Sequence, residues 1–311
     1  MQTEGGVVRA PRRCRATRSE HVAEFLQFLF SGLTSGSIYA LAALGFAIIF
    51  NASGVINFAQ GEFIMLGGMV SVFLAAAGLA LPLAILGAVL VAVVAGVLID
   101  KAAIEPARDA EVVTLIIITI GASILIQGLA QVIFGKGQHA LKPFSGDTPL
   151  AIGGASLLPQ SLWVMAVSAL VVVALWAFFN RTRFGKAMLA SSYNRLGAQL
   201  VGIDTRRVWL VAFALSGALG AIAGALAAPI TMTSYDAGLM LGLKGFVAAT
   251  LGGLGSGAGA VAGGLVLGLA EAMTAGYISS AYKDAVPFVL ILLVLFFLPR
   301  GIFGSRAVDR V

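Results

Sequence analysis

Polar side chains that could bind a solute or an ion gather in one short stretch of a largely apolar sequence. Between residues 25 and 99 the only formally charged side chain is Glu62, and the amides of Asn51, Asn57 and Gln60 lie close to it in the chain. A carboxylate at membrane depth is costly unless it is paired or faces water, so it generally marks a pathway or a coupling site. These four residues are therefore candidates for lining a substrate pathway.

Each of these residues also has a purely structural interpretation. Glu62 could hold neighbouring helices together by hydrogen bonds, and Asn51 or Asn57 could cap a helix that restarts within the membrane. Lys244, in a later apolar run, is the natural partner for Glu62 because opposite charges buried in lipid tend to pair. Lys244 could instead extend to the interface, and Glu271 is expected at headgroup level near a helix end.

The sequence contains no pattern typical of catalysis, of a metal site or of a bound cofactor. His21 and His139 fall in polar segments, Cys14 is the only cysteine, and no G-x-x-x-x-G-K-[ST] phosphate-binding loop is present. We therefore expect a transport subunit that is not itself an enzyme. Uphill transport would draw on an ion gradient or on a separate ATPase.

Composition places these residues in a membrane protein. Hydrophobic residues make up 59% of the chain and charged residues 11%, whereas a soluble domain is about a quarter charged. Several apolar runs reach the roughly 20 residues that cross a hydrocarbon core, and they are continuous rather than alternating. We predict an all-α, polytopic transmembrane helical bundle of about eight to nine spans with one or two broken or re-entrant segments. The net charge of +6 lies in short segments between the runs, which argues against a nucleic-acid partner and for contact with membrane lipid.

The predicted organisation is a polar, arginine-rich tail at residues 1–24 followed by a transmembrane domain at 25–311. Positive charge assigns the loop at residues 181–207 to the cytoplasm, and the arginine-free loop at 135–160 is placed outside. The tail is expected to be cytoplasmic, but the count of runs leaves the orientation of the N-terminus open. The nine apolar runs are 25–50, 55–79, 82–99, 112–134, 162–179, 208–228, 239–254, 258–274 and 286–298.

Nine spans would put the two arginine-rich termini on opposite faces, so one run is expected to be broken or re-entrant. Two candidates are interrupted by polar or glycine-rich sequence, NASGVINFAQGE at residues 51–62 and LKGFVAATLGGLGSG at 243–257. Interrupted apolar segments in corresponding positions of two halves are the best sequence indication of a transport site. Lys244 therefore joins the candidate pathway residues.

Long stretches of the chain resemble the permease subunit of bacterial ABC importers for branched-chain amino acids. The resemblance is carried by SGLTSGSIYALAALGFAIIFNASGVINFAQGEFIMLGG, FGKAMLASSYNRLGAQLVGID, LKGFVAATLGGLGSGAGAVAGG and GYISSAYKDAVPFVLILLVLFFLPRGIFG, in order and at the family's spacing. It implies a bacterial inner-membrane permease that works with a second, related permease. It also implies two cytoplasmic ATPase subunits and a periplasmic binding protein.

The same resemblance implies that residues 185–202 dock into the ATPases. This segment combines small residues with an apolar face formed by Met188, Leu196, Leu200 and Val201, which suits a partner's groove. The predicted coupling residues are Gly185, Lys186, Ala187, Met188, Ala190, Leu196, Ala198, Leu200 and Gly202. Alternatives that stay open are a urea or amide permease of the same family, an ion-coupled secondary transporter in which Glu62 binds the ion, and a passive channel.

Overall fold

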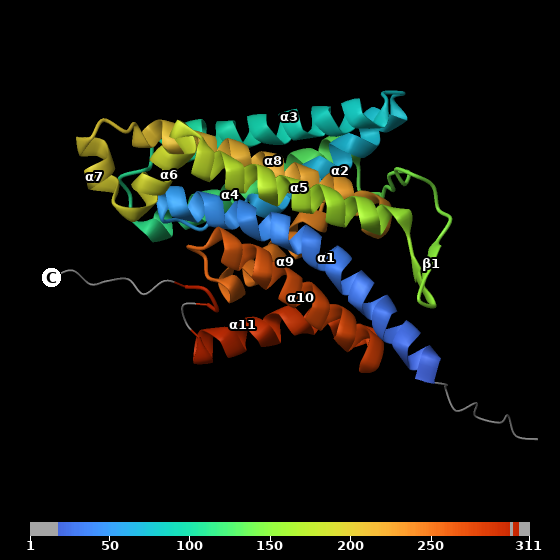
Figure 1. Ribbon diagram of the computed structural model, residues 1–311. Coiled ribbons are helices and arrows are strands. Elements are labelled where there is room, and N and C mark those ends of the chain that lie inside the picture. Colours follow the sequence, from blue (N-terminus) through green and yellow to red (C-terminus); the bar gives the residue numbers. More distant parts are fainter. Residues whose placement is uncertain (1–17, 299–300, 305–311) are drawn as a thin grey trace, which may run out of the picture.

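The computed structural model describes residues 18–298 and 301–304, and this part of the chain is almost entirely helical (Figure 1). The membrane-type helices are α1 (Arg18–Ser53), α2 (Gln60–Ala76), α3 (Leu81–Ile99), α4 (Val112–Phe134), α5 (Pro159–Arg181), α8 (Thr205–Thr231), α9 (Ala237–Gly252), α10 (Gly257–Tyr277) and α11 (Val286–Phe297). The shorter elements are the π-helical turn η1 (Asp100–Ile104), the hairpin β1 (Leu150–Ile152) and β2 (Ala155–Leu157), the helices α6 (Arg183–Tyr193) and α7 (Arg195–Leu200), and the 3-10 turn η2 (Ser280–Ala285).

The predicted fold class is confirmed, and both interrupted runs are shorter than a full span. In the described part of the chain, 7 helices are long and apolar enough to cross a membrane, while α2 and α9 are shorter apolar helices. Residues 54–59 separate α1 from α2, and residues 232–236 separate α8 from α9. One or two broken segments were expected and two are present, one in each half of the chain, but the second break lies before the predicted run at 243–257.

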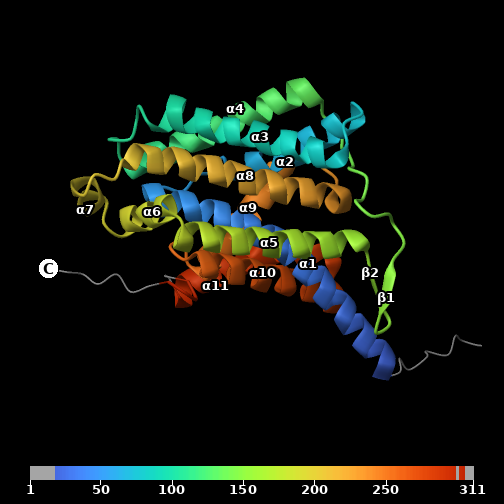
Figure 2. The same ribbon diagram turned by 45° about the horizontal axis from the view of Figure 1, so that its top comes forward.

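The two ends of the bundle carry different connections. Helices α6 and α7 lie at one end, and the hairpin lies at the other, beside the beginning of α1 (Figures 1 and 2). The backbone N–H of Ser156 in β2 donates to Oε1 of Gln27 in α1, at 2.8 Å. Residues 18–24, expected in the tail, are the first turns of α1 and lie at the hairpin end; the rest of the predicted tail, 1–17, lies outside the described residues.

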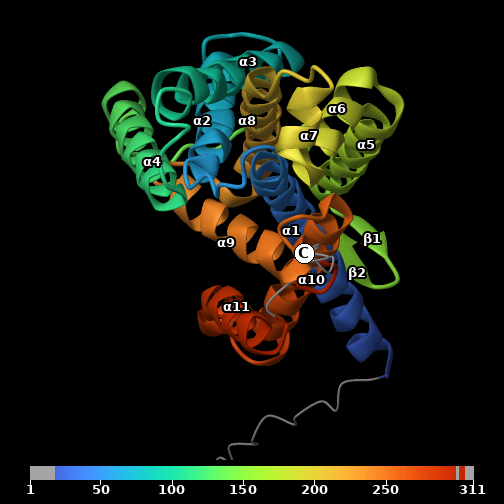
Figure 3. The same cartoon turned by 90° about the vertical axis from the view of Figure 1, so that its left-hand side faces the viewer.

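The centre of the bundle consists of α1, α2 and α8, seen end-on in Figure 3. Helices α4 and α11 lie at the periphery. Helix α1 packs closely against α10, because a Cβ atom on Gly264 or Gly268 of α10 would overlap the backbone of Ala40 or Gly36 in α1. Small residues at such crossings let membrane helices approach closely where lipid offers no hydrophobic drive for association.

Local sequence explains where the two broken spans begin. Helix α1 stops at Ser53 because Gly54 adopts a positive φ of 74°, which favours glycine. At the second break, Met232 has a φ of 59° and is the only non-glycine residue with positive φ among those described. Thr233 then exchanges two backbone hydrogen bonds of 2.8 Å with His139, so this break is tied to the loop between α4 and α5.

Candidate functional site

The first break is a tight, buried turn around Asn57. The side chain of Asn57 is 1% exposed, and its Oδ1 accepts a hydrogen bond of 3.1 Å from the N–H of Ala59, immediately before α2. This bond forms a turn that leads into α2, but it is not the helix cap that was one of the two interpretations of Asn57, because α2 has no side-chain cap. Its Nδ2 atom is buried without a hydrogen-bond partner among the described residues.

Gln60 opens α2 and joins three helices. Its side chain is fully buried; Nε2 donates to the carbonyl oxygen of Ser216 in α8 at 3.3 Å, and Oε1 accepts from the Ser216 hydroxyl. The same hydroxyl lies 3.0 Å from the carbonyl oxygen of Gly45 in α1 and donates to it as well. Gln60 thus fixes the start of α2 against α1 and α8.

Replacing Gln60 by leucine should lower stability, because the hydroxyl and carbonyl of Ser216 would lose a buried partner. We expect a loss of about 1–3 kcal/mol in the free energy of unfolding. The midpoint of thermal unfolding in detergent measures it, with the exposed loop substitution Gln138→Leu as control. Equal midpoints for the two variants would contradict this role.

Glu62, in the first turn of α2, is the most buried carboxylate of the break. Its side chain is 2% exposed, and Oε1 accepts a hydrogen bond of 2.9 Å from the hydroxyl of Ser123 in α4. Oε2 has no hydrogen-bond partner in the described chain. One turn before Ser123, the hydroxyl of Thr119 accepts from the N–H of Phe58 at 3.1 Å, so α4 contacts the break through two polar bonds.

The two broken spans meet backbone to backbone at glycines. A Cβ atom on Gly61 would overlap the carbonyl oxygen of Gly238 in the first turn of α9, and one on Gly238 would lie 3.0 Å from Oε2 of Glu62. Gly242, one turn further along α9, also faces Gly61. Glu62 therefore lies where the N-terminal ends of α2 and α9 come together.

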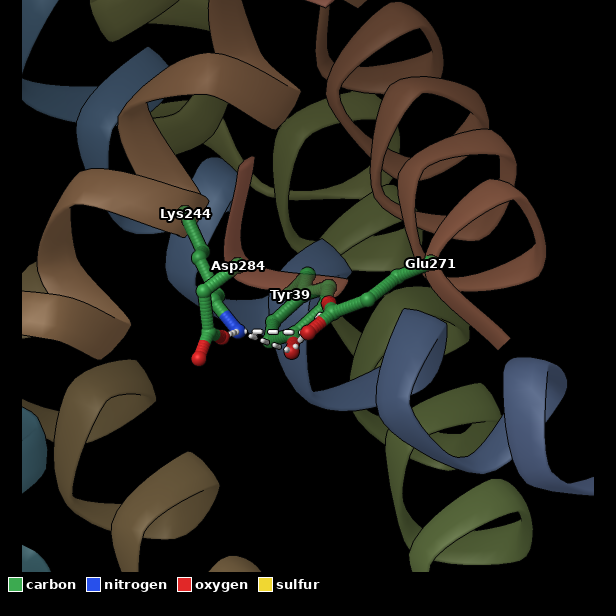
Figure 4. Close-up of polar contacts among 4 residues, drawn as sticks. All are labelled: Tyr39, Lys244, Glu271 and Asp284. Carbon is green, nitrogen blue, oxygen red and sulfur yellow. Dashed lines mark hydrogen bonds and ion pairs between the residues drawn. The ribbon is translucent and has the colours of Figure 1, made fainter. Parts of the chain in front are cut away.

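Lys244 does not pair with Glu62, contrary to the expectation from the sequence. Its Nζ lies 2.6 Å from Oε1 of Glu271 in α10 and 2.8 Å from Oδ1 of Asp284 in η2 (Figure 4). The hydroxyl of Tyr39 in α1 donates to Oε2 of Glu271 at 2.7 Å. Glu271 was expected at headgroup level but is 7% exposed, because it supplies the counter-charge for a buried lysine.

Asn51 and Met188 line one cavity. The cavity has a volume of about 630 Å³ and lies between α1, α5, α6 and the beginning of α10. Asn51 comes from the last turn of α1 and Met188 from α6. One predicted pathway residue and one predicted coupling residue thus share a wall, at the end of the bundle that carries α6 and α7.

The predicted coupling residues divide into two groups. Gly185, Met188 and Ala198 are buried against the chain's own helices, so Met188 is not on the free apolar face to which it was assigned. Lys186, Ala190, Leu196, Leu200 and Gly202 are exposed, and Ala187 is half-buried. Leu196 and Leu200 are 74% and 88% exposed, and the neighbouring Tyr193 and Val201 are 89% and 77% exposed. These last four form an unshielded apolar surface on α6 and α7.

The turn η1 and the residue after it, Glu105, lie near the start of α8, at the end of the bundle that carries α6 and α7. Lys101 and Glu105 form an ion pair of 2.6 Å, and the hydrogen bond from Lys101 holds the pKa of Glu105 below its ordinary value, with help from Arg206 at the start of α8. Both side chains of the pair are open to solvent, so the pair adds little to stability.

The sequence analysis missed residues that contact the first break and residues that contact Lys244. Ser123 and Thr119 are single hydroxyls in an apolar helix, where they commonly bond to their own backbone. Asp284 was missed although a buried lysine needs a counter-ion. Three acids follow Lys244 in the sequence, and only the fold shows that Glu271 and Asp284 reach it.

Comparison with known proteins finds similarity to branched-chain amino acid transport permeases along most of the chain. The family model described as branched-chain amino acid transport system / permease component matches residues 28–295. The high-affinity branched-chain amino acid transport system permease protein LivH of Escherichia coli strain K12 is 36% identical over 308 residues, covering 94% of this chain and 100% of LivH. BraD of Pseudomonas aeruginosa is 34% identical over 306 residues, covering 93% and 99%. The ribose import permease RbsC of Escherichia coli strain K12 is 27% identical over 285 residues, covering 86% and 84%. The chain is therefore a multi-pass membrane protein that belongs to the branched-chain amino acid transport system permease family.

Proposed function

We propose that this chain is the membrane-spanning permease subunit of an ATP-driven importer for branched-chain or related amino acids. The observation that carries the proposal is the similarity to LivH along 94% of the chain. A permease of this kind works with cytoplasmic ATPase and periplasmic binding partners. RbsC, a ribose permease, matches less closely and over less of the chain, which favours an amino acid as the cargo.

The two broken spans support a pathway near α2 and α9. Discontinuous helices that meet within the membrane are typical of transport sites, because their free backbone ends face the cargo. Asn57 and Glu62 present polar atoms near this meeting point that have no hydrogen-bond partner among residues 18–298 and 301–304. Asn51 belongs to the cavity at the cytoplasmic end, where the cargo would leave. Gln60 and Lys244 hold the surrounding helices in place through their buried contacts.

The apolar surface formed by Tyr193, Leu196, Leu200 and Val201 supports docking of an ATPase at α6 and α7. Large apolar side chains on an aqueous surface usually mark an interaction site. Two ATPases and a second, related permease would complete the assembly. The peripheral helix α4 suits contact with that permease, since Val132 and Ile133 are 85% and 67% exposed.

Deleting residues 188–200 should abolish co-purification of the ATPase subunits, because the docking surface is removed. The single substitution Leu200→Glu should weaken co-purification by about tenfold or more, since it places a charge in an apolar contact. Gln138→Glu adds the same charge to the loop at the other end and should have no effect. Full ATPase recovery with Leu200→Glu would contradict docking at this surface.

Reconstitution tests the proposed function as a whole. The chain, its companion permease, the ATPases and the binding protein are placed in vesicles with labelled leucine, isoleucine or valine. We expect uptake that needs ATP and every component. Uptake of these amino acids by this chain alone, driven by an ion gradient, would instead establish the secondary transporter that the sequence left open.

A further inference from the structure

The carboxylate of Glu62 has an unused hydrogen-bonding atom in a place closed to water. Its side chain is 2% exposed, Ser123 bonds to Oε1, and Oε2 has no hydrogen-bond partner in the region described. A buried polar atom left without a partner costs about 1–3 kcal/mol, and more when it is charged. Such an atom is retained at this cost where a ligand bonds to it during function.

The unused oxygen points at the start of a second helix. Oε2 lies 3.0 Å from the Cβ position of Gly238, in the first turn of α9. The beginnings of α2 and α9 both lack a side-chain cap. At α9 the N–H groups of Ala237 and Leu239 donate to the carbonyl oxygens of Ser234 and Asp236, so among the first three only the N–H of Gly238 has no partner in the described chain. The first N–H groups of a helix have no partner within the helix, and they carry a partial positive charge. Glu62 is itself the anion next to α9 in this conformation.

These groups complement both ends of a zwitterion. A free carboxylate oxygen attracts an ammonium group, and uncapped N–H groups at a half-helix in the membrane attract a carboxylate. We propose that Glu62 binds the ammonium group of an α-amino acid in transit while the first turn of α9 at Gly238 binds its carboxylate. The inference rests on the proposed function and names the class of cargo that this site takes, a zwitterionic α-amino acid.

Helix α4 closes the site. It reaches the break through Ser123 and Thr119, one helical turn apart, and among its residues only Leu115, Thr119 and Ala130 are buried. Two hydrogen bonds and little packed surface therefore hold α4 over Glu62. Moving α4 outward frees Oε1. Because the carbonyl oxygen of Gly61 fills the space beside Gly238, the start of α9 must also draw back from α2 before the cargo's carboxylate can replace that of Glu62 there.

A cysteine at the contact between α4 and Glu62 reports binding directly. The variant Ser123→Cys is made in a Cys14→Ser background, which removes the only native cysteine. The complex of both permeases and the ATPases, without binding protein, is treated with a methanethiosulfonate reagent. We expect leucine at millimolar concentration to slow labelling by about threefold or more, as a weak ligand that occupies about two-thirds of the sites or more would.

Two leucine analogues test whether the ammonium group and the carboxylate are both needed for protection. Leucinol keeps the ammonium group without the carboxylate, and 4-methylpentanoate keeps the carboxylate without the ammonium group. Neither should slow labelling at the concentration at which leucine does. Equal protection by either analogue, or none by leucine, would overturn the inference.

Substitution of Glu62 tests the same site by transport. In the complete complex, Glu62→Gln should lower leucine uptake by about tenfold or more, the size of one lost charge-assisted hydrogen bond. Stimulation of ATP hydrolysis by the loaded binding protein should persist, because the docking surfaces are unchanged. The exposed acid Glu111, replaced in Glu111→Gln, is the control and should transport normally.

The outcomes distinguish this inference from the proposed function. Wild-type complexes that take up no branched-chain amino acid would overturn the function. Wild-type uptake that survives unchanged in Glu62→Gln would overturn only the role of Glu62. If Glu62→Gln fails to assemble, the labelling of Ser123→Cys still decides the matter, because that variant keeps the carboxylate.

Discussion

Replacing Lys244 by methionine should prevent stable assembly of the permease. Its Nζ is held by Glu271 and Asp284 at 2.6 and 2.8 Å, and the Lys244 side chain is 8% exposed. Removing one partner of a buried ion pair leaves an uncompensated charge, which costs about 3–5 kcal/mol. That is a large fraction of the net stability of a typical domain. The yield of monodisperse protein and its thermal midpoint measure the effect.

The exposed pair Lys101–Glu105 is a matched control for this prediction. Its N–O distance is also 2.6 Å, but its side chains are 50% and 26% exposed, so Lys101→Met should change stability by about 1 kcal/mol or less. Combining Lys244→Met with Glu271→Met should recover part of the loss, since both charges of the buried pair are gone. Combining Lys244→Met with Glu62→Gln should give additive defects, because these residues share no contact. Recovery in the second combination would contradict the charge pairing of Figure 4.

Replacing Gly224 by alanine should separate α2 from α8 and block accumulation in the membrane. A Cβ atom at this position would overlap the carbonyl oxygen of Ile64, and it would lie 2.9 Å from the backbone nitrogen of Gly68. Overpacking against side chains costs about 1–3 kcal/mol, and backbone atoms cannot turn aside as side chains do. We therefore expect a loss of about 3 kcal/mol or more, measured as membrane level and as thermal midpoint in detergent.

Gly128 in α4 is the control for Gly224, because replacing it by alanine should not destabilise the protein. No atom lies within 4 Å of the Cβ position at Gly128. Alanine is favoured over glycine within a helix by about 1 kcal/mol, so Gly128→Ala should leave stability unchanged or raise it. If both glycine variants accumulate equally, the close crossing of α2 and α8 is wrong.

The sequence predicted the elements of this fold well because each apolar run is long enough to be a helix by itself. It also located the first break, since NASG before Val55 cannot continue an ordinary span. The second break was misplaced: it lies at residues 232–236, before α9, whereas the glycine-rich run after Lys244 ends α9. The start of α1 at Arg18 was missed, because a polar end of a helix has no apolar period to mark it.

The sequence singled out the charged residues of the candidate site but not their pairings. Glu62 and Lys244 are the rare charges at membrane depth, so composition alone singled them out. Which acid meets Lys244 depends on how α9, α10 and η2 pack. That packing brings Glu271 and Asp284 to Lys244, whereas charge alone had suggested Glu62. Ser123 on α4 could not be found, because a serine in an apolar helix is common.

The order of synthesis gives the buried lysine a further consequence. Lys244 leaves the ribosome 27 residues before Glu271 and 40 residues before Asp284. When α9 reaches the insertion machinery its counter-charges do not yet exist, and a lone lysine at the centre of a span opposes insertion by about 2.5–3.5 kcal/mol. Entry of α9 into the bilayer is therefore coupled to the arrival of α10, and the two helices integrate as a charge-compensated hairpin.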